Sequence, residues 1–151
     1  MPLTGGSLPF LGCRLRRSID TTTVSGVWSI IPFDIVSYDT DNLHTAAPNP
    51  SYITIRTAGV YEFGASVRWI DDNVGYRGIA ILKNGATVLV FNRIHPTPNA
   101  ITVQMANTVS EFDEDDYIEL WAAQLSGGNL VLESKVDYTP VFWAYRIALP
   151  T

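Results

Sequence analysis

The sequence predicts an all-β sandwich or barrel built from about ten short strands. Short runs that alternate apolar and polar residues recur along the chain, and turn-forming residues separate them roughly every 8–12 positions. No segment keeps the 3.6-residue apolar period of a helix. Asn84-Gly85 stands between two apolar runs, and this pair accepts the positive φ angles of a two-residue type I′ hairpin.

Each expected strand is bounded by residues that favour turns. Residues 13–17 alternate Cys and Leu against Arg, as a half-buried strand does, and Pro32 ends the run at 27–31. Pro, Gly, Asn and Asp close most of the later runs. In chain order the expected strands are residues 13–17, 27–31 with 33–37 as a candidate continuation, 52–56, 60–70, 76–83, 86–92, 101–109, 117–125, 130–134 and 141–149.

Two of these strands are nearly continuous in apolar residues, at 79–82 and 88–92. Such strands are typically covered on both faces. In a sandwich of two sheets the second cover has to come from another subunit. The composition agrees, because 46% of the residues are hydrophobic and only 17% are charged.

The 151 residues suffice for one domain with a full core. The single cysteine, Cys13, excludes an intrachain disulfide and a cysteine-based zinc site. The first residues lack the pattern of a signal peptide, and no apolar stretch reaches the roughly 18 residues of a membrane span. We therefore expect a soluble protein made in the cytoplasm, without a membrane partner. The net charge of −5 argues against a nucleic-acid partner.

Residues 1–12 contain prolines and glycines without periodicity, and we interpret them as an extended arm before a domain at 13–151. The alternative is a disordered terminus. The basic residues Arg14, Arg16 and Arg17 follow directly after the arm. They are candidates for pairing with acidic residues of a partner or a neighbouring subunit, and the alternative is that they form a solvated strand face. The candidate docking residues are Leu3, Leu8, Phe10, Leu11, Arg14 and Arg16.

An acidic corner near residue 114 offers weak calcium candidates in Asp113, Asp115 and Asp116. The spacing does not match an EF-hand, and the simpler interpretation is a solvated turn, so we expect no metal or other cofactor. Neither a Gly-x-Ser-x-Gly elbow nor a phosphate-binding glycine loop is present. The sequence therefore predicts a protein that is not an enzyme.

Three segments carry a family resemblance: Gly59-Val-Tyr61-Glu-Phe63, Asn84-Gly85, and Asp116-Tyr117-Ile-Glu-Leu120, followed by the closing Phe142-Trp143-Ala-Tyr145. In this order they resemble the jelly roll of the complement one-q globular head and the tumour necrosis factor family. The resemblance implies a homotrimer with aromatic strands along its axis. The trimer-interface candidates are Tyr61, Phe63, Tyr117, Trp121, Phe142, Trp143 and Tyr145, and the alternative for each is a place in the core. Trp69 is the aromatic residue expected to be most exposed.

A narrower likeness rests on Cys13-Arg14-Leu-Arg16, Trp28-Ser-Ile-Ile-Pro32-Phe33-Asp34, Tyr38-Asp-Thr-Asp41 and Asn49-Pro-Ser51. These segments are similar to small virion proteins and fibre tips of tailed bacteriophages. The likeness implies a trimeric decoration or cement protein on the virion, with the major capsid protein as its partner. The alternative is a head- or tail-fibre tip that binds a host-surface carbohydrate or protein through loops 39–50, 71–75 and 93–99.

Overall fold

The computed structural model describes residues 7–135 and 137–151, so Leu3 of the expected arm lies outside the described residues. Within these ranges the chain forms two antiparallel sheets and no helix, and hence none that is long and apolar enough to cross a membrane. The all-β prediction is confirmed.

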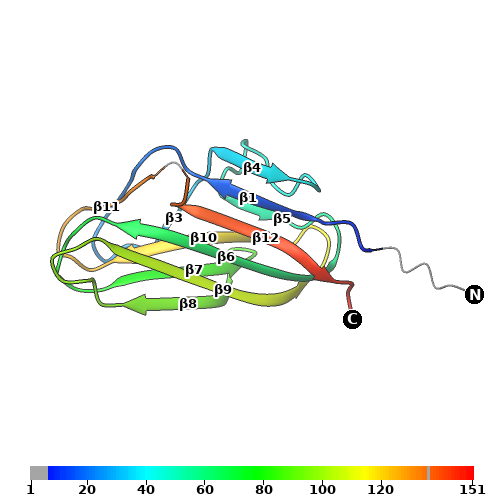
Figure 1. Ribbon diagram of the computed structural model, residues 1–151. Helices are drawn as coiled ribbons and strands as arrows, with labels where there is room; N and C mark the ends of the chain where they lie inside the picture. The colour runs from blue at the N-terminus through cyan, green and yellow to red at the C-terminus, as the bar shows by residue number, and fades with distance from the viewer. Residues whose placement is uncertain (1–6, 136) are drawn as a thin grey trace, which may run out of the picture.

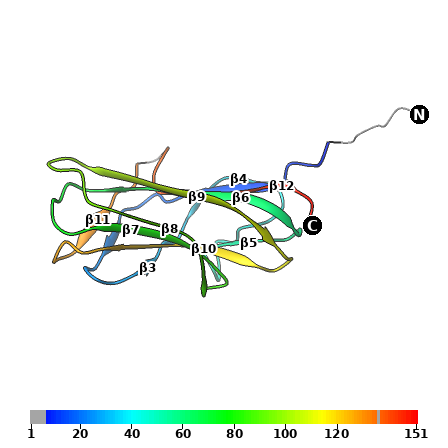
Figure 2. The same ribbon diagram turned by 90° about the horizontal axis from the view of Figure 1, so that it is seen from below.

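The first sheet has seven strands: β1 (Gly12–Arg16), β2 (Thr21–Thr23), β4 (Ile35–Asp39), β6 (Gly59–Trp69), β9 (Thr102–Phe112), β11 (Leu130–Leu132) and β12 (Val141–Ala148). The second has five: β3 (Ser29–Ile30), β5 (Tyr52–Thr54), β7 (Arg77–Lys83), β8 (Thr87–Ile94) and β10 (Tyr117–Gln124). The two sheets lie face to face as separate layers (Figures 1 and 2).

The long strands set the layout of each layer. In the seven-stranded sheet β12 lies between β1 and β6, and β9 pairs along the other side of β6. In the five-stranded sheet β10 pairs with β7, which in turn pairs with β8. One edge of the sandwich is therefore formed by β8 of one sheet and β9 of the other, which hydrogen-bond to each other through Asn92 Nδ2 and the carbonyl oxygen of Met105 at 2.7 Å.

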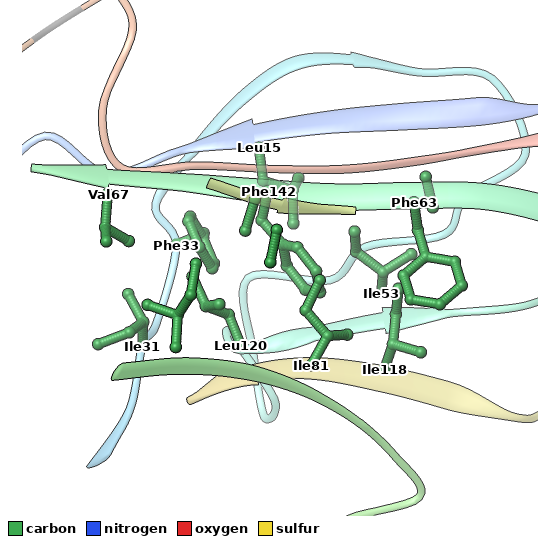
Figure 3. Close-up of a cluster of buried hydrophobic side chains, with 14 of the residues drawn as sticks. Leu15, Ile31, Phe33, Ile53, Phe63, Val67, Ile81, Ile118, Leu120 and Phe142 are labelled. Atoms are coloured by element: carbon green, nitrogen blue, oxygen red, sulfur yellow. The ribbon is translucent and has the colours of Figure 1, made fainter. Parts of the chain in front are cut away.

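The core lies between the layers and is almost entirely apolar. Side chains such as Phe63 and Phe142 point inward from the seven-stranded sheet toward Ile81, Ile118 and Leu120 of the other (Figure 3). All five are fully buried. The free thiol of Cys13 belongs to this core, and its burial, followed by the charge of Asp39, raises its pKa. Cys13 is therefore a packing residue and not a nucleophile.

The central hairpin matches its prediction. Asn84 and Gly85 have φ angles of 54° and 69°, as a type I′ turn requires, and β7 and β8 pair on either side. The side chain of Asn84 also anchors the hairpin: its Nδ2 donates to Asp116 Oδ1 at 2.8 Å, and its Oδ1 accepts from the backbone N–H of Tyr117 at 2.9 Å.

The segment around Pro32 was predicted wrongly in part. The run at 27–31 gives only the two-residue β3, and residues 33–37 do not continue it. Instead, the chain crosses to the other sheet after Phe33, and β4 pairs with β1. Strand β2, which pairs with β11, was not predicted, because three consecutive threonines carry no apolar alternation.

Four aromatic side chains lie inside the chain rather than on its surface. Tyr61, Phe63 and Phe142 were interface candidates and Trp69 was expected to be exposed, but all four have 0% exposure. They occupy inward positions of β6 and β12, where the period of two along a strand directs them to the second sheet. A fully buried ring cannot contact another copy, so these four predictions are corrected.

Candidate functional site

The outer surface of the seven-stranded sheet carries a group of aromatic rings, which we call the face patch: Phe10, Tyr38, Trp143 and Tyr145. Tyr145 stacks on Trp143 with ring centres 5.5 Å apart, and Phe10 lies 6.2 Å from Tyr145 and 5.9 Å from Tyr38. Phe10 and Tyr38 are 54% and 39% exposed. The face patch therefore places aromatic surface in solvent, away from the core.

Two glycines beneath the face patch allow its rings to lie close to the sheet. A Cβ atom on Gly64 would be 2.7 Å from Cζ2 of Trp143, and one on Gly12 would be 2.7 Å from Cβ of Tyr145. The Tyr145 hydroxyl donates to Glu62 Oε2 at 2.5 Å, and this bond raises the pKa of Tyr145. The rings are thus held in fixed positions on the strands.

Strand β9 reverses the usual pattern of a sandwich strand. Its inward positions include the polar Thr102 and Gln104, which are 2% and 1% exposed, whereas its outward positions include Val103 and Met105, which are 48% and 65% exposed. Gln104 is satisfied inside, where it accepts from Trp69 Nε1 at 3.2 Å and donates to the carbonyl oxygen of Asn92 at 2.9 Å. The outward apolar residues have no such role within the chain.

The exposed apolar residues continue from β9 around the edge onto β8. We call Val88, Phe91, Val103 and Met105 the edge patch. Val88 and Phe91, which are 55% and 50% exposed, also border an apolar depression of about 360 Å³ on the five-stranded sheet. The other lining residues of this depression are Trp28, Ala80, Leu82 and Trp121.

The remaining interface candidates are not brought together. Trp143 and Tyr145 belong to the face patch, whereas Trp121 lines the depression on the opposite sheet. Tyr117 stacks on Tyr52 at 4.1 Å, outside both patches. Sequence reasoning had assigned an intersubunit cover to residues 88–92, which include Val88 and Phe91, but it missed Val103 and Met105. The apolar outward positions of β9 are a usable signal once its hydrogen-bonded inward side is known.

The described part of the expected arm ends against the domain. The Thr40 hydroxyl donates to the carbonyl oxygen of Phe10 at 2.9 Å, and the backbone N–H of Arg146 donates to that of Leu11 at 2.8 Å. Leu8 is 50% exposed. Phe10 and Leu11 are thus fixed to the domain, whereas Leu8 lies in solvent.

Arg14 and Arg16 both point outward from β1 and are held by neighbours. Arg14 donates to Ser37 Oγ at 3.4 Å and to the carbonyl oxygen of Asp137 at 3.2 Å. Arg16 donates to Ser37 Oγ at 2.9 Å and lies 3.7 Å from Asp137 Oδ1. The two guanidinium groups form one basic strip beside the face patch.

The acidic corner is organised by cations of the chain itself. Asp116 lies 2.6 Å from Lys83 Nζ, and Asp115 lies 3.4 Å from Arg56 Nη1. Burial opposes ionisation of Asp116, but the hydrogen bonds from Lys83 and Asn84 outweigh it and hold its pKa below the ordinary value. Asp113 donates its backbone N–H to Asp116 Oδ2. Across the described ranges, no group of three His, Cys, Asp or Glu side chains is arranged to hold a metal ion.

The three loops that were expected to form a recognition end do not all meet. Loops 71–75 and 93–99 lie together, because Asn73 Nδ2 donates to Asn99 Oδ1 at 3.0 Å and the backbone N–H of Asn99 donates to Asn73 Oδ1 at 2.8 Å. Loop 39–50 follows the end of β4, which pairs near Gly12 and therefore lies at the opposite end of the sandwich, where β6 begins. The predicted recognition end is therefore reduced to loops 71–75 and 93–99, and loop 39–50 is not part of it.

Comparison with known proteins gives the class of fold. A crystal structure of murine APRIL matches with a TM-score of 0.71 and 10% identity over 92% of this chain and 100% of that one. Eiger TNF from S. frugiperda gives 0.66 and 11% over 95% and 96%, and the globular domain of zebrafish complement 1qA gives 0.64 and 13% over 92% and 98%. No family model matches the sequence, and no curated protein matches it.

The domain is thus a jelly roll of the tumour necrosis factor and complement C1q type. At 10–13% identity these neighbours establish the fold alone. The predicted fold class is confirmed, and a homotrimer is consistent with it.

Proposed function

We propose that the protein is a non-enzymatic subunit of a homotrimer, in which the edge patch of one copy packs on the face patch of the next. The observation that carries the proposal is the reversed pattern of β9, which leaves Val103 and Met105 in solvent above a polar inner side. Large apolar side chains grouped in solvent on one strand are expected at an interaction site.

The two patches also fit the symmetry of a closed ring. A threefold ring is built from heterologous contacts, in which one surface of a subunit meets a different surface of its neighbour. The face patch lies over β1, β4 and β12, and the edge patch lies over β8 and β9 on the far side of the same sandwich. The face patch lies on a flat sheet face and the edge patch lies on an edge. Each subunit can therefore contact one neighbour through its face patch and the other neighbour through its edge patch.

Single charges placed in the edge patch test the trimer. We expect the wild-type chain to sediment with the mass of three chains and Met105→Glu to sediment as a monomer at the same concentration. Ile19→Glu is the matched control, because Ile19 is 59% exposed and lies outside both patches. A wild-type monomer, or a Met105→Glu variant that stays trimeric, would refute the arrangement.

We further propose that this trimer decorates a bacteriophage capsid and stabilises it, with the major capsid protein as its partner and the virion surface as its location. Support comes from the sequence likeness to small virion proteins, from exposed Leu8 at the start of the described chain and from the basic strip of Arg14 and Arg16. Three arms on one trimer would bind a shell more tightly than one, because the second and third bind at a high effective concentration.

The contacts of Phe10 and Leu11 sharpen the test of this second proposal. Removing residues 1–9 leaves both backbone bonds to the domain intact, so the shortened chain should still fold and assemble. We expect the full-length protein to bind capsids stripped of it and to raise their disruption temperature, and the shortened chain to do neither. Equal binding by both forms would exclude a role of residues 1–9 in capsid binding, and binding by neither form would exclude capsid decoration.

The alternative function is a fibre tip that binds a host-surface receptor. The pairing of loops 71–75 and 93–99 favours it, since loops supported by a rigid scaffold commonly carry recognition. Adsorption of the purified trimer to host cells, with and without substitutions in these two loops, distinguishes this function from decoration.

A further inference from the structure

A second pocket, of about 530 Å³, lies at the end of the sandwich where the paired loops meet. Its lining residues are Asn73, Gly75, Tyr76, Arg93, Ile94 and His95. They come from the connection between β6 and β7 and from the end of β8, at the left of Figure 1. The face patch lies toward the other end of β6, where Tyr145 pairs with Glu62. The pocket is therefore separate from the face patch, and it adjoins the edge patch at Phe91, on which Arg93 stacks.

A buried arginine, Arg77, holds the loop that forms one wall of this pocket. Arg77 has 0% exposure and donates to the carbonyl oxygens of Asp72, Val74 and Tyr76 at 2.8–3.0 Å and to Asp72 Oδ1 at 2.9 Å. Gly75 has a φ of +73°, and a Cβ atom there would lie 1.7 Å from the carbonyl oxygen of Leu125. The loop that forms one wall is thus fixed before any ligand arrives, which lowers the entropy cost of binding.

Arg93 presents a guanidinium group that the chain does not use for its own ion pairs. Its central carbon lies 4.2 Å from the ring centre of Tyr76 and 5.5 Å from that of Phe91. Arg93 is hydrogen-bonded through its backbone in the β7–β8 ladder, but within the described residues the side chains of Arg93 and His95 form no hydrogen bond or ion pair. By contrast, the nearby Asp72 is already paired with Arg77 at 2.9 Å. A stacked arginine with unused donors is suited to a planar carboxylate, which it binds through two parallel hydrogen bonds.

The other walls indicate what accompanies the carboxylate. Asn73 uses one N–H and one lone pair of its side-chain amide on Asn99, which leaves the second of each for a ligand hydroxyl. Tyr76 carries a hydroxyl, and Ile94 adds an apolar surface. A pocket that combines one charged donor, two neutral polar groups and an apolar wall matches a sugar ring better than a bare anion. Its volume falls within the usual 300–1,000 Å³ of small-molecule sites.

We propose that this pocket binds a carboxylate-bearing sugar, with Arg93 holding the carboxylate and Asn73 and Tyr76 meeting the ring hydroxyls. The inference gives a ligand class to the receptor-binding alternative, and it does not depend on capsid decoration or on the trimer.

The test uses saturation-transfer NMR and calorimetry on the full chain with three probes: N-acetylneuraminic acid methyl glycoside, methyl glucoside and inorganic phosphate. We expect the acidic sugar to bind saturably and at least about tenfold more tightly than the neutral sugar, as the loss of a charge-assisted contact implies. Arg93→Gln should weaken binding of the acidic sugar to a similar degree. Arg93→Lys should restore only part of it, because lysine keeps the charge without the planar fork.

Arg56→Gln is the matched control, since Arg56 is an exposed arginine in the acidic corner at Asp115, away from this pocket, and it should leave binding unchanged. No binding of the acidic sugar, equal binding by Arg93→Gln, or binding of phosphate alone would each overturn the proposal. The oligomeric mass is measured on the same samples. A trimer that does not bind the sugar refutes this inference alone, and a monomer that binds it refutes only the trimer.

Discussion

Replacing Arg77 by methionine should cost the protein more stability than any exposed ion pair provides. The substitution keeps most of the side-chain volume but removes a fully buried guanidinium that serves four oxygen atoms of loop 72–76. It also removes the cation that lies 5.9 Å from the ring centre of Trp69. Three backbone carbonyls and the Asp72 carboxylate then have to find water or remain without partners.

The magnitude follows from this loss. Arg77 is fully buried, whereas the side chain of Asp72 is 29% exposed and can partly be reached by water. Each buried hydrogen-bonding group left without a partner costs about 1–3 kcal/mol, so for the three carbonyls and the carboxylate together we expect about 3–5 kcal/mol. For a domain of 150–250 residues each kcal/mol lowers the melting temperature by about 2–4 °C, so we expect a fall of roughly 6–20 °C. The control Arg56→Met removes an ion pair whose side chains are 41% and 78% exposed, and it should cost about 0–1 kcal/mol.

Urea unfolding and calorimetry of both variants decide the matter. Adding Asp72→Asn to Arg77→Met should recover part of the loss, because no uncompensated charge then remains. If Arg77→Met costs no more than Arg56→Met, the buried network does not stabilise the loop and the pocket beside it is not preorganised.

Three further changes have defined outcomes. Phe142→Ala should lower the free energy of unfolding by about 3–5 kcal/mol in urea titrations, because the ring is a core residue, and a changed oligomeric mass at unaltered stability would contradict this. Asp116→Asn should destabilise the protein at pH 7, and the difference from the wild type should shrink as the pH is lowered below 3.8: the folded pKa is lowered, so the stabilisation is present above the ordinary value of 3.8 and is lost as pH falls through the folded pKa. Glu119→Gln should raise the melting temperature relative to the wild type more at pH 8 than at pH 4. Burial raises the pKa of Glu119, so wild-type stability falls as pH rises from the ordinary 4.5 through the folded pKa. An equal shift in melting temperature at both pH values would exclude this explanation.

Local patterns predicted the parts of the fold that local forces determine. The hairpin at Asn84-Gly85 follows from two residues that tolerate positive φ, and the long strand β6 follows from its alternation. The interruption at Pro32 was visible, but the crossing of the chain to the other sheet after it was not. That crossing depends on β4 pairing with β1, a contact between segments that local sequence does not connect.

The candidate site was less predictable because a period of two identifies the faces of a strand without saying which one lies inside. In β9 the polar Gln104 faces inward, since Trp69 and the backbone of β7 and β8 satisfy its amide. In β6 and β12 the apolar side chains face inward instead, and Tyr61, Phe63 and Phe142 lie in the core. Loops 71–75 and 93–99 were named as recognition loops, but the pocket between them was not predicted, because it depends on a contact between Arg93 of β8 and Tyr76 of the loop before β7.

The position of β12 also constrains how the chain is made. This strand comes after every other strand in the sequence, yet it lies in the middle of its sheet between β1 and β6. During synthesis β1 therefore has no partner on that side until residues 141–148 have left the ribosome. The sheet therefore closes between β1 and β6 only when this last strand has been made, and the face patch, which needs Trp143 and Tyr145 of the same strand, forms with it.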